Sequence, residues 1–128
     1  MPFLCRKYLA LTRLSNLPIR IETARFERPK IDANLRFCQV GCEGLFVEDE
    51  YHILFICSRY NQLRLPWFNK IKIPENFQNM QQIEKLKLDL NSPENVKITG
   101  QFLVDISNVR SKILLKKILV QFPKNCTE

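Results

Sequence analysis

The sequence predicts a mainly α-helical fold: a small domain with a zinc-knuckle-like turn and an irregular basic N-terminal segment. Three observations lead to this prediction. From Glu48 to Leu65 no proline or glycine interrupts the chain, and acids stand at its start, as at helix N-termini. From Phe102 to Leu114 apolar residues recur at three- and four-residue steps, which is typical of an amphipathic helix. Between residues 38 and 57, three cysteines and the only histidine are clustered.

The composition indicates one compact domain. The 128 residues are 45% hydrophobic and 26% charged, which is enough for a modest core and too short for most multidomain enzymes. The net charge of +7 favours a nucleic-acid or other anionic partner. Only three glycines are present, and neither G-x-G-x-x-G nor G-x-x-x-x-G-K-[ST] occurs. A glycine-rich phosphate loop is therefore excluded.

The cysteines and the apolar runs indicate the cellular compartment. Five cysteines follow no secretory signal, so buried or metal-bound thiols are expected in place of a disulfide framework. The longest apolar run, Ile53 to Cys57, is far shorter than a membrane span. We therefore expect an intracellular protein, in the cytoplasm or the nucleus, with no membrane partner.

The charge distribution divides the chain into three segments. Residues 1–37 carry eight basic against three acidic residues and form the basic N-terminal segment. Within it we expect a helical turn or two from Tyr8 to Leu14 and a loop over 29–37 that leads to the first cysteine. Residues 38–65 would form the zinc-knuckle-like turn and a helix, and residues 66–128 the C-terminal helices.

Three longer helices are predicted, over about 48–65, 78–90 and 93–121. Pro66 should end the first of them, and the residues up to Pro74 would form a connection. Ser92 and Pro93 should begin the last helix as its N-cap and its first helical residue. The helices are expected to pack these side chains into one core: Phe55, Leu63, Trp67, Phe68, Phe102, Ile106 and Ile113.

One group of residues carries metal-binding chemistry. It follows the pattern C-x3-C-x9-H-x4-C and consists of Cys38, Cys42, His52 and Cys57. Thiolate and imidazole ligands in two close pairs are typical of a closed tetrahedral zinc site. Gly41 and Gly44 make the tight turn of the first pair possible. Residues five apart stand about 140° apart around an ideal helix, so we expect the helix to start late or to loosen between His52 and Cys57.

Other interpretations of these residues stay open. Free cysteines are common core residues, and Cys57 stands in an apolar run where it would simply pack. His52 would then only cap the helix or pair with Glu48. A catalytic thiol, which needs an activated cysteine, a positioned histidine and an oxyanion hole, is disfavoured, and the adjacent Glu48, Asp49 and Glu50 are better explained as helix N-terminal charge. We expect no independent active site and no small-molecule substrate.

Two groups of basic residues are candidates for binding RNA or DNA. The first precedes the cysteines and consists of Arg13, Arg20, Arg25, Arg28 and Lys30. The second belongs to the last predicted helix and consists of Arg110, Lys112, Lys116 and Lys117. Arginines beside Tyr8 and Phe26 can contact phosphates and stack on unpaired bases. A solvated helix surface accounts equally well for the second group.

Several stretches together resemble a known family. They are LPIRIETARF over 17–26, RFC over 36–38, VEDEYHILFIC over 47–57, and the later Tyr60 and Arg64. This combination resembles the zinc-binding-like C-terminal segment that follows the reverse transcriptase of LINE-type (non-LTR) retrotransposons. The resemblance covers about residues 8–110, and the E-D-E-x-H element with its following cysteine is the most specific part.

The resemblance implies a function. Carried over position by position, it makes Cys38, Cys42, His52 and Cys57 the metal ligands of a non-catalytic module that helps a reverse transcriptase engage RNA or target DNA. No Tyr-x-Asp-Asp polymerase element occurs in this chain. Two positions depart from the family pattern: the first pair is C-x3-C in place of C-x2-C, and Ala24 replaces a glycine. The alternative is a structural or protein-interaction domain whose metal site holds the fold together or has been lost.

Overall fold

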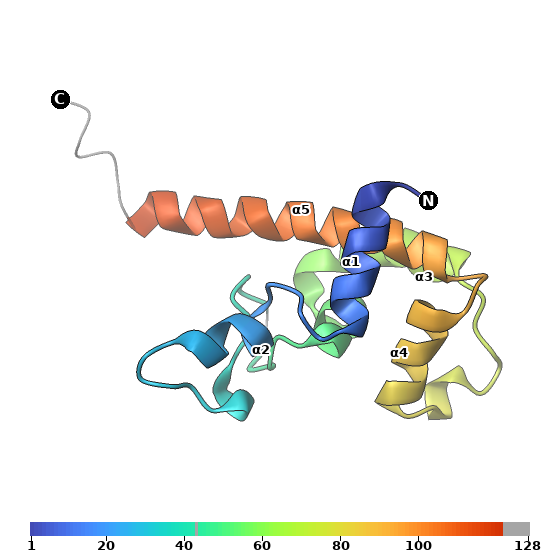
Figure 1. Cartoon of the computed structure of the whole chain (residues 1–128), viewed down its shortest axis with the longest axis horizontal. Helices are drawn as coiled ribbons and strands as arrows, with labels where there is room; N and C mark the ends of the chain where they lie inside the picture. Colours follow the sequence, from blue (N-terminus) through green and yellow to red (C-terminus); the bar gives the residue numbers. More distant parts are fainter. Residues whose placement is uncertain (43, 122–128) are drawn as a thin grey trace.

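The computed structural model describes residues 1–42 and 44–121, and this part of the chain is mainly helical (Figure 1). Short 3-10 and π-helical turns connect the α-helices, and the β-structure in these residues is limited to one isolated bridge. The predicted fold class is therefore confirmed. The α-helices are α1 (Phe3–Arg13), α2 (Arg20–Thr23), α3 (Asn61–Lys70), α4 (Gln82–Asn91) and α5 (Val96–Gln121).

Helix α5 is the axis of the molecule. Helices α1, α3 and α4 all pack against it, and its C-terminal part extends beyond them, past the segment that contains α2 (Figure 1). Gly100 allows α1 to come close to α5, because a Cβ atom there would lie 3.0 Å from Leu9 and 3.1 Å from Cys5. A larger side chain at this position would have to push the two helices apart.

The core forms where α3 meets α5. The rings of Trp67 and Phe102 stack with centroids 4.4 Å apart, and the indole Nε1 of Trp67 donates a hydrogen bond of 3.1 Å to Thr99 Oγ1. Of the predicted core residues, Trp67, Phe102 and Ile106 are buried in one cluster, against which the other four pack partly buried: Phe55, Leu63, Phe68 and Ile113. The prediction of one shared core is confirmed, and this core also includes Leu9 and Leu17 from the N-terminal segment.

The predicted helix over 48–65 is wrong in its middle and at its end. The chain forms a π-helical turn over His52–Ile56, leaves the helical conformation at Cys57, and resumes as α3, which continues through Pro66 to Lys70. The connection predicted after Pro66 is therefore partly helical. Pro66 removes one backbone hydrogen bond from α3, and the burial of Trp67 beside it outweighs that loss.

The other boundaries differ by a few residues. Helix α1 begins at Phe3, so the helical turns predicted over Tyr8 to Leu14 belong to a longer helix, and the rest of the N-terminal segment is irregular between short turns. Helix α4 begins later than predicted because Gln81 and Glu84 form a capping box at its start. Helix α5 begins at Val96, after a turn over residues 92–95.

One buried carboxyl group lacks a partner among the described residues. Asp89, on α4, has no exposed surface, and neither of its oxygens is hydrogen-bonded. Burial raises the pKa of the Asp89 carboxyl to about 7, whereas an ordinary aspartate has a pKa near 4. The carboxyl is therefore protonated in the folded protein over a pH range in which it is ionised in the unfolded chain.

We predict that Asp89→Asn stabilises the protein at neutral and alkaline pH. The pKa is higher in the folded than in the unfolded state, so Asp89 lowers the free energy of unfolding progressively as the pH rises from about 4 to about 7. An amide cannot ionise, and the variant should gain on the order of 2–4 kcal/mol above this range and nothing below it. Urea unfolding across the pH range measures the difference. The same pH dependence in both proteins would contradict the prediction.

Candidate metal centre

The first two cysteines of the cluster lie on a short hairpin. The chain pairs antiparallel at a single bridge between Phe37 and Val47, and the N–H of Cys38 donates a hydrogen bond of 2.9 Å to Phe46 O. Gly41 has a φ of +76°, in the left-handed region that favours glycine. The turn that the sequence predicts between the cysteines therefore depends on Gly41 as expected.

Gly44 meets a different requirement. A Cβ atom at this position would collide with the ring of Phe46. That ring stacks on the imidazole of His52, with centroids 5.3 Å apart and planes inclined by 29°. Gly44 thus leaves room for the aromatic side chain that covers the histidine.

His52 and Cys57 lie at the two ends of the π-helical turn. The N–H of Cys57 donates a hydrogen bond of 2.8 Å to His52 O, which is an i→i+5 bond. The wider turn brings both side chains to one side, whereas an α-helix would separate them by about 140°. Asp49 begins the turn as an N-cap, because its Oδ1 accepts a hydrogen bond of 2.8 Å from the His52 N–H. The predicted loosening between His52 and Cys57 is confirmed.

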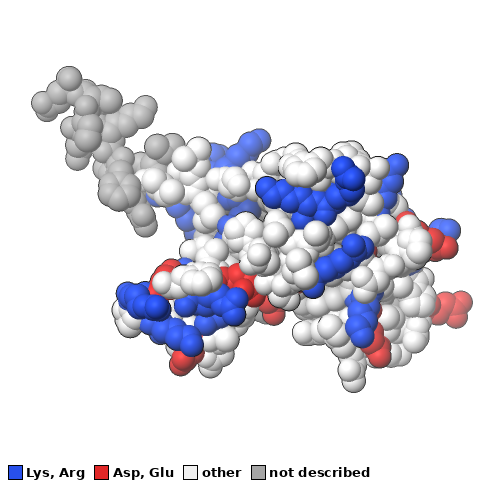
Figure 2. All heavy atoms as spheres, viewed as in Figure 1, with Lys and Arg blue, Asp and Glu red and all other residues white. Residues whose placement is uncertain are grey.

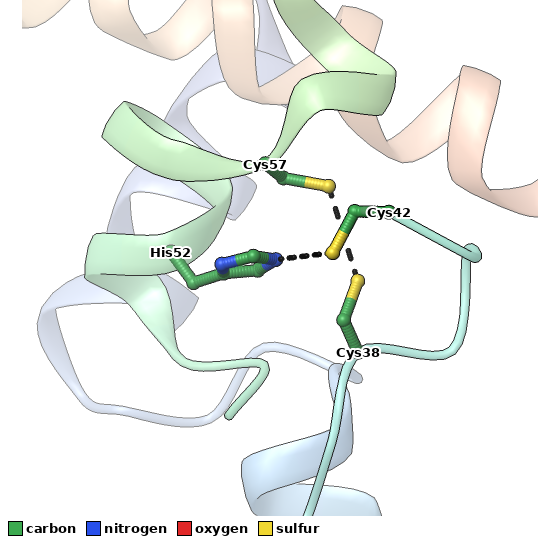
Figure 3. Close-up of side chains that lie close together, drawn as sticks. All are labelled: Cys38, Cys42, His52 and Cys57. Atoms are coloured by element: carbon green, nitrogen blue, oxygen red, sulfur yellow. Dashed lines mark hydrogen bonds between the residues drawn. The ribbon is translucent and has the colours of Figure 1, made fainter. Parts of the chain in front are cut away.

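The four predicted ligands point toward one another (Figure 3). The Sγ atoms of Cys38 and Cys57 are 3.9 Å apart, Cys42 Sγ is 3.6 Å from His52 Nε2, and all four ligand atoms lie within 4.8 Å of one another. Ligands about 2.3 Å (sulfur) and about 2.0 Å (nitrogen) from a tetrahedral zinc stand about 3.8 Å (S to S) and about 3.6 Å (S to N) apart. The cysteines are free thiols. The four residues are therefore placed to hold a metal ion.

The three thiols are coupled to one another. The hydrogen bond with Cys57, together with burial, raises the pKa of the Cys38 thiol to about 12, and the same hydrogen bond lowers the pKa of Cys57. Burial raises the pKa of Cys42. Cysteines bind a metal ion as thiolates, so a metal at this site must displace the thiol protons. Its affinity must therefore decrease as the pH falls.

Arg64 fixes the end of the π-helical turn. Its guanidinium donates hydrogen bonds to the carbonyl oxygens of Ile53 at 3.0 Å, Leu54 at 2.8 Å and Cys57 at 2.7 Å. Because the helix breaks at Cys57, the carbonyls of Ile53 and Leu54 lie at a helix end, where helical partners are missing. The carbonyl of Cys57 also accepts a hydrogen bond of 3.3 Å from the Tyr60 N–H. Arg64 belongs to the residues that resemble the retrotransposon family, but its sequence context predicts no role for it. Its partners are main-chain oxygens, which neither a charge pattern nor a spacing identifies.

We predict that Arg64→Gln destabilises the turn and weakens metal binding. The variant loses charge-assisted hydrogen bonds to three carbonyls, so the free energy of unfolding should decrease by about 3 kcal/mol. Arg59→Gln is the matched control, because Arg59 is exposed on the same segment. Urea unfolding and a zinc titration measure both effects. If the two variants behave alike, the carbonyl contacts of Arg64 do not fix the turn.

Glu48 has a different role from the one predicted. It does not act as helix N-terminal charge: it is fully buried, and its carboxylate accepts hydrogen bonds of 2.6 Å from the Arg20 N–H and 2.7 Å from Arg110 Nη2. Cys38 Sγ lies 3.6 Å from Glu48 Oε2. The carboxylate thus connects a predicted metal ligand to α5.

The predicted nucleic-acid residues divide into two sets. Five of them have partners within the molecule. Three arginines pair with glutamates: Arg20 with Glu27, Arg25 with Glu22, and Arg110 with Glu48. Arg13 and Lys117 donate hydrogen bonds to the carbonyl oxygens of Leu90 and Gln39. Among the described residues, Arg28 contacts only the neighbouring Glu27 carbonyl, at 3.5 Å, and the side chains of Lys30, Lys112 and Lys116 are exposed. Figure 2 shows Lys and Arg in separate groups with uncharged surface between them. Nucleic-acid binding stays a prediction.

Comparison with protein-family models, with curated proteins and with solved structures finds no match for this chain. Within residues 1–42 and 44–121, no helix is both long and apolar enough to cross a membrane. The functional assignment therefore rests on the chemistry of the site and of the surface.

Proposed function

We propose that this chain is a non-catalytic zinc-binding domain that binds RNA or DNA. The observation that carries the zinc assignment is the spacing of the ligand atoms: 3.9 Å between Cys38 and Cys57 sulfurs, and 3.6 Å between Cys42 sulfur and His52 nitrogen. Both values fit a tetrahedral zinc. Three thiolates and one imidazole fill such a site and leave no open position for a substrate, which is typical of structural zinc.

Zinc in this position would join two parts of the chain. Cys38 and Cys42 come from the hairpin that follows the basic segment, and His52 and Cys57 come from the turn that precedes α3. The hairpin itself contains a single bridge. Because binding free energy at a structural zinc is also folding free energy, the metal would order the hairpin against the helices.

We predict that the purified protein contains one zinc ion per chain and that Cys42→Ser and His52→Gln each abolish it. A closed site needs all four ligands, so the loss of one leaves zinc open to exchange and removal. Elemental analysis of the full chain measures the content. Cys5→Ser is the matched control, because Cys5 is a buried free thiol outside the cluster and its substitution should leave the zinc content unchanged.

Hydrogen exchange after removal of zinc also tests the structural role of the metal. A chelator should increase amide hydrogen exchange in residues 36–57 and leave the core between α3 and α5 protected, because the hairpin contributes mainly Val40 to that core. Metal-free protein with unchanged exchange in residues 36–57, on which added zinc has no effect, would exclude a structural zinc.

The nucleic-acid assignment is supported by one part of the surface, the basic loop, which we define as residues 25–30. Phe26 has 76% of its surface exposed, and the guanidinium of Arg25 lies 5.8 Å from the centroid of its ring. Arg28 and Lys30 are exposed beside it. An exposed aromatic ring among cations can stack on an unpaired base while the cations contact phosphates. The resemblance to the segment after non-LTR retrotransposon reverse transcriptases supports the same assignment.

We predict weak, largely sequence-independent binding to single-stranded RNA or DNA that is lost as salt increases. Each phosphate contact releases counterions, so the triple variant Arg25→Gln, Arg28→Gln, Lys30→Gln should lower the salt slope by about one unit for each lost contact. Fluorescence anisotropy of a labelled oligonucleotide over a salt series measures the slope.

The control for this measurement has the same change in net charge. Lys70→Gln, Lys87→Gln, Lys97→Gln removes three exposed cations outside the basic loop, and its salt slope should match that of the wild type. Equal slopes for the two triple variants would show that binding depends on net charge alone. Absence of binding at low salt would exclude the nucleic-acid assignment.

A protein-interaction domain is the second candidate, and one observation favours it. A groove of about 680 Å³ lies between the start of α1, α3 and the first half of α5, and the side chains of Trp67 and Phe102 contribute to it. Lys70 and Lys97 also line it. An apolar groove with cations fits an apolar segment of a partner that carries acidic residues. If the chain does not bind nucleic acid even at low salt, the protein-interaction domain is the favoured candidate.

A further inference from the structure

The buried ion pair between Glu48 and Arg110 lies against the proposed zinc site. Glu48 is fully buried, and each of its carboxylate oxygens accepts a hydrogen bond from the Arg110 guanidinium, at 2.7 Å and 3.3 Å. One of these oxygens, Oε2, is also 3.6 Å from Cys38 Sγ. The pair is therefore one contact away from a ligand atom.

The net charge of the proposed zinc site indicates a role for the Glu48–Arg110 pair. Two positive charges of zinc and three thiolates leave one net negative charge, and the Glu48 carboxylate beside Cys38 adds another. The side chain of Arg110 is only 12% exposed, so water screens its charge poorly. Arg110 is placed to offset one of these two negative charges, and Glu48 is placed to orient it.

The same arginine joins α5 to the loop between the first two ligands. Arg110 Nη2 donates a hydrogen bond of 3.0 Å to Gln39 Oε1, and Lys117 Nζ donates to Gln39 O. Gln39 follows the ligand Cys38 directly. Two residues on one face of α5 therefore contact the loop that would bind the metal.

We propose that Arg110 and Glu48 are positioning residues of the zinc site: Arg110 compensates part of the negative charge of the ligands, and Glu48, whose carboxylate lies against Cys38, orients the guanidinium. This inference rests on the proposed zinc site. It gives Arg110 a role in metal affinity in place of the role in nucleic-acid binding that the sequence indicates. The proposal also explains why a cation and an anion are buried together at this point, although a buried pair contributes little stability by itself.

Zinc affinity, measured by competition with a chelating dye on the full chain, tests the proposal. Arg110→Gln should weaken zinc binding about tenfold or more, because it removes the compensating charge, and Arg110→Lys should restore part of the affinity. Glu48→Gln should weaken binding much less than Arg110→Gln, because its amide oxygen still accepts a hydrogen bond from Arg110 while a negative charge beside an anionic site is removed. Lys112→Gln is the matched control: it makes the same charge change on an exposed position of the same helix and should bind zinc like the wild type.

A merely structural role for the pair gives a different result. Glu48→Gln and Arg110→Gln would then weaken zinc binding equally, in step with their loss of stability in urea, and this outcome would overturn the proposal. The double variant Glu48→Gln, Arg110→Gln buries no charge and keeps the comparison valid if Arg110→Gln alone does not fold. It should bind zinc more weakly than Glu48→Gln alone, and equal affinities would overturn the proposal.

The result also separates this inference from the zinc site itself. A wild-type chain that holds no zinc in elemental analysis would overturn both. A wild-type chain that holds one zinc, with unchanged affinity in Arg110→Gln, would overturn the role of the pair alone.

Discussion

The i→i+5 hydrogen bond from the Cys57 N–H to His52 O, 2.8 Å long, is the constraint on which the arrangement of this domain depends. Two of the apolar residues between these positions enter the core, since Ile53 and Leu54 are almost completely buried. The two polar ends must nevertheless face the same site, which an α-helix does not allow for residues five apart. The π-helical turn meets both demands at once. It also ends the helix at Cys57, so α3 starts in a new direction that places Trp67 against Phe102.

The helical core and the hairpin before the π-helical turn are stabilised by different forces. The helices α1, α3, α4 and α5 share an apolar core, in which burial of surface is the main favourable term. The hairpin before the π-helical turn contributes mainly Val40 to that core, and several of its large side chains, such as Leu45, are exposed. Its position is determined by polar contacts: the proposed metal ligands, the Glu48–Arg110 pair and the carbonyl contact of Lys117. The buried Glu48–Arg110 pair contributes little net stability by itself, whereas zinc at the proposed site would add its binding free energy to folding.

The features of the fold and of the candidate site that the sequence predicts are those that depend on local patterns. The candidate metal ligands can be identified because their spacing is a chemical signature, and α5 because its apolar residues repeat over many turns. The passage of α3 through Pro66 could not be predicted, because α3 packs against α5, which is distant in the sequence. The break at Cys57 is indicated only as a loosening between His52 and Cys57. The pairing of Glu48 with Arg110 joins residues 62 positions apart and has no local signal. Each residue alone has a more ordinary explanation: the glutamate as helix N-terminal charge, the arginine as part of a basic surface.

The arginines show why net charge alone describes this surface poorly. Arg13, Arg36 and Arg64 direct their guanidinium groups to main-chain carbonyls, and Arg110 pairs with a buried carboxylate. A guanidinium has five N–H donors in a fixed plane, so it can satisfy several carbonyls where the chain lacks regular hydrogen bonding. Part of the basic excess of the composition therefore belongs to the interior of irregular segments. Fewer cations therefore remain exposed for an anionic partner than the net charge indicates. The basic loop combines some of them with the exposed ring of Phe26. If a nucleic acid binds there, as we propose, stacking on this ring would contribute beside charge.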